Sequence, residues 1–434
     1  MDKMADVLGR AGAWCGQNKY LSAIKNAFQN FMPLTIAGAI GVLWCNVLVN
    51  DQTGLGLFFK PIMALDFLNP AFQAVNFCTI SCITVGITLG IAQEIGVWNM
   101  GAERAGYIPG LVGLAAWLSV TNTSHMVDGA KEAFTGIAGN ELGATGLFTG
   151  MIIGVLSVEL FCFFEKQDAL KIKMPEQVPP GVARAFEVLV PATITLIITA
   201  CIGSACYNLT GLYLNDVIKN GIQGPLGAVG ATIPGVMIIY LVIMLFWLVG
   251  IHGNNMLSAV KEALFTPLAL ENVEAFNKHQ TPKNIINMYA LQMWGEFGGS
   301  GVTIGLVIAI MIFGKREDNK AIATLSLVPG LFNINETVTF GIPMVLNPIL
   351  GIPFVFACLV TILVGYVLTV IGFCPVACLT VPWTCPPIVF GFLACGANVM
   401  GAVTQAILIV VSTVIYVPFL ISYEKYQNKQ AAEA

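Results

Sequence analysis

About ten long apolar runs, separated by short polar segments, constrain the fold of this chain more than any other feature. They lie at about 28–50, 72–92, 108–121, 145–164, 187–207, 228–250, 285–313, 352–373, 380–396 and 402–421. A helix needs about 20 apolar residues to cross the hydrocarbon core of a bilayer. Only 10% of the 434 residues are charged, against about 25% in soluble domains. The sequence therefore predicts an all-α polytopic membrane protein with about ten transmembrane helices.

Lysine and arginine in the short loops predict the orientation, because positively charged loops stay on the cytoplasmic side. The loop at 165–184 holds four such residues, and the loop at 93–107 holds Arg104. Both loops are expected to be cytoplasmic. The amphipathic N-terminal segment at 1–27 and the tail at 424–434 are expected on the same side.

This alternation of sides fails between 252 and 348. The segment at 252–284, with Lys261, and the turn containing Lys315 are both basic, yet a single apolar run separates them. One simple crossing cannot join two cytoplasmic loops. Glycine and proline recur throughout the region, so re-entrant or discontinuous helices are expected, as in transporters. A charged loop on the opposite side is the alternative.

The chain divides at an amphipathic linker at 211–227. Residues 28–210 form regular spans with short loops, whereas residues 228–423 are interrupted and hold most of the intramembrane polar groups. Gly146, Gly150 and Gly154 recur every four residues in the first part. Such small-residue faces allow helices to approach closely, either within one subunit or between two.

The most unusual stretch is 329–348, where Glu336, Asn333 and Asn335 stand in apolar surroundings broken by proline and glycine. A carboxylate at the centre of a membrane helix costs about 2.5–3.5 kcal/mol, so an intramembrane carboxylate is a site candidate by default. Glu336 is predicted to line a solute site, either as base for a hydroxyl or as a proton carrier. A structural role, satisfied by backbone N–H groups, is the alternative.

Three further places hold candidate site residues. His252 follows an apolar run and is flanked by glycines, so it is either a hydrogen-bond donor to substrate or a histidine bonded to a carbonyl at the membrane edge. Glu296 precedes Gly298 and Gly299, whose backbone N–H groups could form an anion-binding nest, although a simple helix break explains the glycines as well. Trp383 is either a stacking face for a ring or an interfacial anchor.

Several functions are not expected. The twelve cysteines form no C-x-x-C pair, and the three histidines have no ligand spacing, so no metal site is predicted. The sequence contains no glycine–lysine nucleotide loop, so ATP hydrolysis is not expected. It contains no basic block either, so nucleic acid is not an expected partner. No cofactor is predicted.

These motifs together resemble the membrane permease component, enzyme IIC, of the bacterial phosphoenolpyruvate-dependent phosphotransferase system, in its lactose, cellobiose and diacetylchitobiose branch. The most specific similarity is Leu331-Phe-Asn-Ile-Asn-Glu336, followed by Phe340-Gly-Ile-Pro343 and Leu346-Asn-Pro348. The second is Gly250-Ile-His-Gly253. Thr337 departs from the pattern, since proline is expected there.

The resemblance implies a function that composition alone does not. Such a permease imports a β-linked disaccharide across the bacterial inner membrane. A partner IIB protein, which carries a phosphocysteine and receives its phosphoryl group from IIA, then phosphorylates the sugar. The chain would be the membrane subunit of a sugar phosphotransferase, with the phosphoryl donor on the partner. A homodimer is implied, with the N-terminal spans forming much of the interface.

The resemblance also implies roles for the candidate residues. Glu336 would accept the proton of the attacking sugar hydroxyl, and His252 would hydrogen-bond the sugar or stabilise the transferring group. The residues implied to bind substrate are Asn335, Asn333, Trp383, Gly298, Gly299 and Glu296. The competing interpretations are a proton-coupled secondary sugar transporter with Glu336 as proton carrier, and a sugar sensor that does not transport.

Overall fold

The computed structural model describes residues 14, 17–51, 55–125, 134–175, 177–225, 230–342, 344–345 and 347–433. Most of the predicted segment at 1–27 before Gln17, together with Pro343 and Leu346 of the Glu336 motif, lies outside the described residues. The chain forms two compact units. One comprises Gln17–Gly38 and Ala74–Gly227, and the other includes Ala39–Gln73 and Ala228–Ala434.

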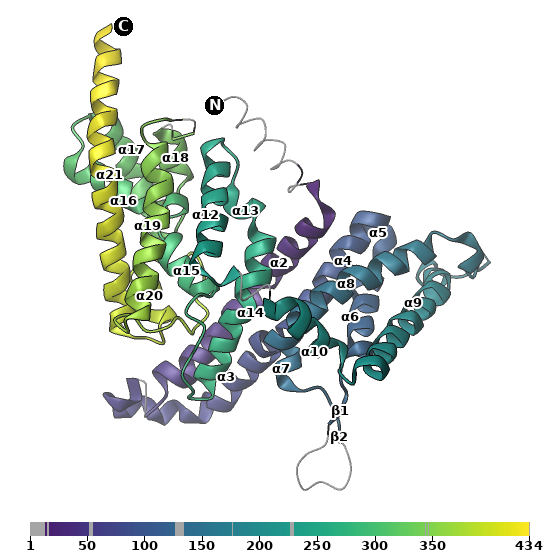
Figure 1. The fold of residues 1–434 in the computed structure, drawn as a ribbon. Coiled ribbons are helices and arrows are strands. Elements are labelled where there is room, and N and C mark those ends of the chain that lie inside the picture. Colours follow the sequence, from purple (N-terminus) through teal and green to yellow (C-terminus); the bar gives the residue numbers. More distant parts are fainter. Residues whose placement is uncertain are drawn as a thin grey trace. The chain divides into compact units, whose positions relative to one another are not determined.

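Helices make up nearly all of the regular structure (Figure 1), as predicted for an all-α membrane protein. Five helices in the described ranges are long and apolar enough to cross a bilayer, and two bent helix pairs raise the number to seven. Two apolar helices, at Ile108–Val120 and Ile233–Leu248, are shorter. The expected number of about ten spans stays a prediction. A short antiparallel hairpin, β1 (Ser124–His125) with β2 (Phe134–Thr135), was not foreseen from the sequence.

The first unit is built around four helices that pack on one another: α4 (Ile83–Met100), α6 (Ile108–Val120), α8 (Ala144–Glu165) and α9 (Pro180–Thr210). Its shorter helices are α5 (Ala102–Ala105), α7 (Gly139–Leu142) and α10 (Leu214–Ile218), and α2 (Lys19–Leu43) and α3 (Asn69–Asn76) continue from one unit into the other. Trp117 and Ile153 lie in the core of the bundle. Much of α9 leaves apolar side chains such as Leu189 and Ile197 exposed, as suits a lipid-facing helix.

Small residues allow the helices of this bundle to approach closely. A Cβ atom added at Gly150 of α8 would lie 2.2 Å from Oγ1 of Thr88 on α4. One added at Gly113 of α6 would lie 2.3 Å from Cβ of Ala92, also on α4. Packing within the unit, one of the two alternatives for the glycine spacing, therefore accounts for the face around Gly150.

A buried carboxylate holds two loops at one end of the bundle. Glu165, the last residue of α8, is 3% exposed and forms ion pairs with Arg104 at 2.8 Å and with Arg184 at 2.9 Å. Arg104 belongs to the loop at 93–107 and Arg184 to the segment that begins α9. Both basic segments thus bind the same carboxylate, which is consistent with the prediction that they lie on one side of the membrane.

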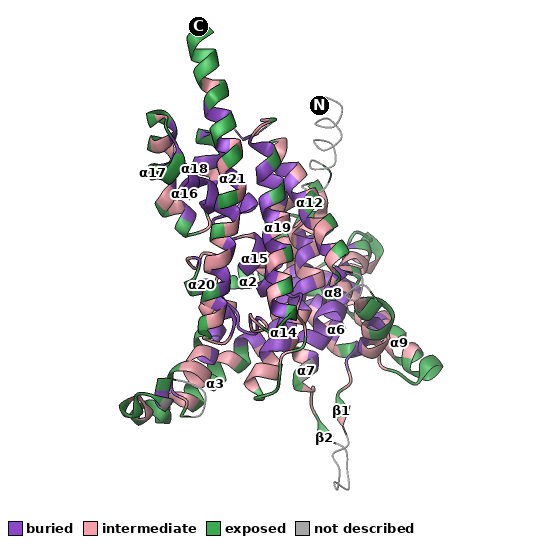
Figure 2. Ribbon diagram, turned by 60° about the vertical axis from the view of Figure 1, so that its left-hand side comes forward, coloured by how far each residue is buried: buried purple, intermediate pink, exposed green. Residues whose placement is uncertain are grey.

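The second unit contains the interrupted elements. Its helices are α12 (Ile233–Leu248), α13 (Gly253–Met256), α14 (Ser258–Asn277), α15 (Met288–Gly295), α16 (Ile304–Phe313), α17 (Glu317–Leu331), α18 (Glu336–Gly341), α19 (Gly351–Val370), α20 (Val389–Ala394) and α21 (Val399–Glu433). Helix α19 packs against α12, α15 and α21, and α16 packs against α17 and α21. Figure 2 shows buried residues on the surfaces where these helices meet.

Two of the helix breaks in this unit lie where the sequence predicted interruptions. The apolar run at 285–313 is split into two helical segments that are bent by 60° between Val302 and Ile304. Helix α17 ends at Leu331, and α18 begins at Glu336. The prediction that the run at 380–396 forms a membrane span is wrong. Only the six residues of α20 are helical there. Three prolines, Pro382, Pro386 and Pro387, lack the N–H groups that a helix needs.

The packing of α4 on α8 gives a first prediction. We expect Gly150→Ala to lower stability by about 1–3 kcal/mol, because the added methyl overpacks the contact with Thr88. Thermal unfolding in detergent, followed by intrinsic fluorescence, measures the change. Gly181→Ala in α9 is the matched control, since nothing lies within 4 Å of a Cβ atom there. Equal melting temperatures for both variants would contradict the close packing.

Candidate functional site

Three helix breaks of the second unit meet at the side chain of Asn333. Its Oδ1 accepts a hydrogen bond from the N–H of Gly298 at 2.6 Å. Its Nδ2 donates to the carbonyl of Trp383, and to that of Cys385 at 3.2 Å. Asn333 has φ +62°, a left-handed conformation that asparagine tolerates better than most residues. One amide therefore joins the break before Glu336 to the breaks at 296–303 and 380–388.

Asn335 adds a second connection between the same segments. It is buried, and its Nδ2 donates to the carbonyl of Ser300 at 2.8 Å. A Cβ atom at Gly299 would lie 2.6 Å from Cβ of Asn335, so the chain can approach this closely only at glycine. Val302 has φ +49°, a conformation that is rare for a β-branched residue. Such locally unfavourable backbone persists where the surroundings determine it, often at functional sites.

In the turn at 298–301, called the glycine turn below, the first two N–H groups are not free to bind a ligand. The N–H of Gly298 is bound by Asn333, and the N–H of Gly299 donates to the carbonyl of Glu296 at 3.0 Å. Both N–H groups that the sequence suggested as an anion nest are therefore engaged within the protein. Substrate contacts of these two glycines stay a prediction.

Glu336 and His252 face each other at this junction. Glu336 is the first residue of α18, and its Oε1 lies 3.9 Å from Nε2 of His252. The two side chains are 46% and 38% exposed, so a solute can reach both. His252 precedes α13, and its Nδ1 accepts the N–H of Asn255 at 3.2 Å. The neutral ring therefore carries its proton on Nε2, which makes Nε2 a donor and Glu336 an acceptor toward the same space.

The imidazole ring of His252 packs against an aromatic ring. The centroid of Trp247, near the end of α12, lies 4.5 Å from that of His252. Trp247 in turn contacts Phe354 of α19 edge-on, at 6.4 Å. The apolar run before His252 thus ends in a packed side chain that supports the ring.

A buried ion pair adjoins the turn at 298–301. Lys261 of α14 pairs with Glu296, donates to Oδ1 of Asn254 at 3.1 Å, and is only 7% exposed at its side chain. Tyr240 donates its hydroxyl to Glu296 at 2.7 Å, and Asn254 donates to Oγ of Ser300 at 2.9 Å. These contacts join the segment after His252 to the glycine turn.

This network was not predicted from the sequence, and the expectation for Lys261 was wrong. Lys261 was expected to be a charge in a cytoplasmic loop, but a buried and paired lysine gives no information on the side of the membrane. The sign that could have revealed the pair is an acidic and a basic residue, Glu296 and Lys261, in one region of otherwise apolar, interrupted sequence. Buried charges are paired because an unpaired one is costly.

The structure brings all of the predicted site residues into one unit, but not into one role. Glu336 and His252 face accessible space. Asn333 and Asn335 hydrogen-bond backbone groups, and Glu296 is engaged by Lys261 and Tyr240. Trp383 is 44% exposed and accepts a hydrogen bond at its carbonyl.

Residues 25–358 match the family described as "Phosphotransferase system, EIIC". The oligo-beta-mannoside-specific EIIC component of Bacillus subtilis (strain 168) is 32% identical over 98% of this chain and 94% of its own length. The cellobiose-specific EIIC component of Lactococcus lactis subsp. lactis (strain IL1403) is 29% identical over 98% of both.

A solved structure has the same fold. The crystal structure of the transporter ChbC, the IIC component from the N,N'-diacetylchitobiose-specific phosphotransferase system, superposes with a TM-score of 0.88. The two chains are 29% identical, and the match covers 97% of each. The chain is a membrane permease by class, and it belongs to the EIIC family of the phosphotransferase system.

The buried ion pair gives a second prediction. Lys261→Met leaves Glu296 without its cation, and removing one partner of a buried pair typically costs about 3–5 kcal/mol. We expect the double variant Lys261→Met/Glu296→Gln to recover a large part of that loss. The free energy of unfolding, measured in detergent for the wild type and both variants, tests this prediction.

Lys278→Met is the control for this prediction, because the ion pair of Lys278 with Glu274 is exposed. Exposed pairs contribute about 0–1 kcal/mol. A double variant no more stable than Lys261→Met alone would show that the two side chains do not act as a pair.

Proposed function

We propose that this protein imports a β-linked disaccharide of the cellobiose, lactose or diacetylchitobiose type and presents it for phosphorylation by the phosphocysteine of a IIB partner. The observation that carries the proposal is the pairing of an acceptor, Glu336, with a donor, Nε2 of His252, across 3.9 Å of accessible space in a chain of the EIIC family. The relatives named above support a β-linked substrate.

A sugar hydroxyl satisfies both groups at once. Its hydrogen donates to the Glu336 carboxylate while its oxygen accepts from Nε2–H of His252. The separation of 3.9 Å is longer than a direct hydrogen bond, so the two groups are not locked to each other. A hydroxyl oxygen can therefore bind between them.

Phosphoryl transfer then needs little more than positioning and charge stabilisation. The hydroxyl oxygen attacks the phosphorus of the partner's phosphocysteine, its proton passes to Glu336, and the S–P bond breaks. The cysteine thiolate stays on the partner. A base placed within hydrogen-bond reach of the hydroxyl contributes typically about 10²–10⁴-fold to the rate.

The partners and the orientation belong to the same proposal. The IIB protein is proposed to reach the sugar from the cytoplasmic side, and the basic segments around Arg104 and Arg184 and both chain termini are proposed to lie on that side. The functional unit is proposed to be a homodimer in the bacterial inner membrane. Trp383, which is exposed and whose carbonyl is bound by Asn333, is proposed to contact the sugar. Asn335, which directly precedes Glu336 in the chain, is proposed to contact it as well.

The role of Glu336 gives a third prediction. In membrane vesicles supplied with phosphorylated IIB, we expect Glu336→Gln to slow sugar phosphorylation by about 100-fold or more, because the amide cannot accept the hydroxyl proton. Binding of radiolabelled cellobiose should remain measurable, since the amide is the same size and retains an acceptor oxygen. Glu274→Gln, at an exposed position of α14, is the control.

The same assay separates the alternatives. A proton-coupled transporter accumulates unmodified sugar without IIB and loses uptake when the proton gradient collapses. A sensor binds sugar without accumulating it. Either result with the wild-type chain would refute the proposed function, and full phosphorylation by Glu336→Gln would refute the assigned base.

A further inference from the structure

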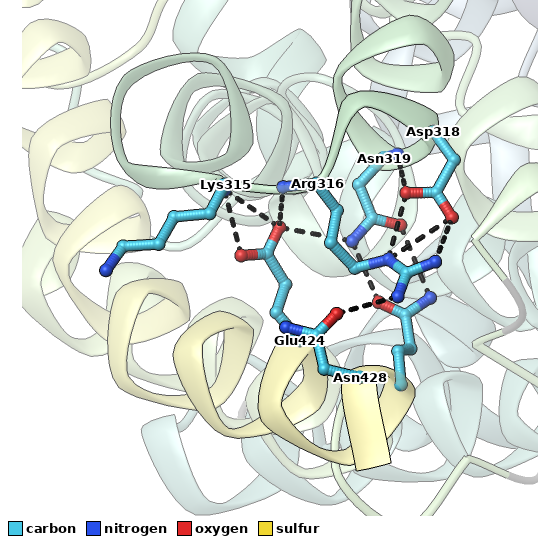
Figure 3. Close-up of polar contacts among 7 residues, drawn as sticks. Lys315, Arg316, Asp318, Asn319, Glu424 and Asn428 are labelled. Carbon is cyan, nitrogen blue, oxygen red and sulfur yellow. Dashed lines mark hydrogen bonds and ion pairs between the residues drawn. The ribbon is translucent and has the colours of Figure 1, made fainter. Parts of the chain in front are cut away.

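Helix α17, which leads to Glu336, is anchored at its far end by a residue of the last helix. The backbone turns into α17 at Lys315 and Arg316, and Arg316 gives no side-chain cap to the helix. The Glu424 carboxylate of α21 accepts the N–H of Lys315 at 2.9 Å and that of Arg316 at 3.3 Å, and Figure 3 shows it pointing into this turn. N–H groups at a helix start need such an acceptor.

The Glu424 carboxylate is enclosed rather than exposed. The residue is 5% exposed and also accepts from Nδ2 of Asn319 at 3.2 Å, itself 2% exposed. The guanidinium of Arg316 is turned toward Asp318 and Asn428 instead. The charge of Glu424 is therefore stabilised by N–H donors of the α16–α17 turn. Charge-assisted hydrogen bonds of this kind are about twice as strong as neutral ones.

Helix α21 also contacts two of the three breaks that meet at Asn333. The hydroxyl of Tyr416 donates to the carbonyl of Gly301 at 2.8 Å. Oε1 of Gln405 accepts the N–H groups of Ile388 at 2.8 Å and Gly391 at 2.7 Å. Helix α21 thus contacts the turn at 298–301 through Tyr416 and the break at 380–388 through Gln405. Through Glu424 it also contacts the start of α17.

Helix α17 connects the Glu424 anchor directly to the catalytic end. Its 15 residues span about 22 Å at 1.5 Å per residue, from the turn bound by Glu424 to the break that holds Asn333. Asn333 and Glu336 follow directly after the end of α17, so we expect a shift at Lys315 to be transmitted along the helix to both residues. A misplacement of about 1 Å in a reacting group can lower a rate about 100-fold.

We propose that Glu424 is a positioning residue for phosphoryl transfer: it fixes the depth of α17 and thereby the position of the Glu336 carboxylate opposite His252. This inference rests on the proposed function of Glu336. The residues around Glu424 thereby affect the rate of phosphoryl transfer, although they lie at the opposite end of α17 from the proposed sugar site.

The test compares Glu424→Ala with Glu433→Ala, an exposed carboxylate at the end of the same helix. Phosphorylation by IIB in vesicles is expressed per sugar-binding site, with sites counted by labelled cellobiose. We expect Glu424→Ala to lower turnover per site by about 10-fold or more, as misplaced groups do, with a smaller change in sugar affinity. Glu424→Gln, which keeps an acceptor oxygen, should recover part of the rate.

A merely structural role predicts a different result. General destabilisation lowers the number of binding sites but leaves turnover per site unchanged, and that result would overturn the proposal. If Glu424→Ala does not accumulate, Asn319→Ala removes a donor to the same carboxylate and should lower turnover per site in the same direction. Wild-type vesicles without phosphorylation would refute the proposed function instead.

Hydrogen exchange of the full chain tests the positioning independently of activity. We expect Glu424→Ala to increase amide exchange at 315–320 and also at 332–336, while Glu433→Ala changes neither segment. An increase confined to 315–320 would show that α17 does not transmit the change. That outcome would overturn the inference even if the permease function holds.

Discussion

The hydrogen bonds of the Asn333 side chain are the interaction on which the rest of the site depends. A broken helix leaves backbone groups unpaired, and a bilayer interior offers no water to pair them. Asn333 offers an acceptor to Gly298 and donors to the carbonyls of Trp383 and Cys385, so one side chain pairs groups from two other breaks. The three interruptions thus satisfy one another next to Glu336, whose side chain stays accessible.

Two further sets of contacts hold these breaks in place. Lys261 and Glu296 form a buried pair whose remaining hydrogen bonds reach Tyr240 and Asn254. Helix α21 contacts two of these breaks through Tyr416 and Gln405, and the start of α17 through Glu424. Polar groups in such a setting are useful only when fully bonded. The site therefore combines rigid support with two accessible groups, Glu336 and His252, that are left to bind a solute.

The sequence could predict this site because polar groups are costly in apolar surroundings. The membrane class followed from run length, the breaks from proline and glycine, and Glu336 and His252 from their apolar neighbours. The errors have the same source. Lys261 was read as a loop charge because one lysine in sequence looks like another, and burial alone distinguishes it. The 380–396 run was read as a span because hydropathy does not register the N–H groups that three prolines lack.

The sequence by itself determined that this protein lies in a membrane, that its helices break near 298–301 and before Glu336, and which polar residues stand at those two breaks. The tertiary structure decided which break faces which. It placed Nε2 of His252 opposite Glu336, and it assigned Asn333, Asn335 and Glu296 to contacts within the protein. It also put Glu424 at the start of α17. Pairings between residues this far apart leave no periodic trace in a sequence, because each depends on isolated contacts of one side chain rather than on a repeated face.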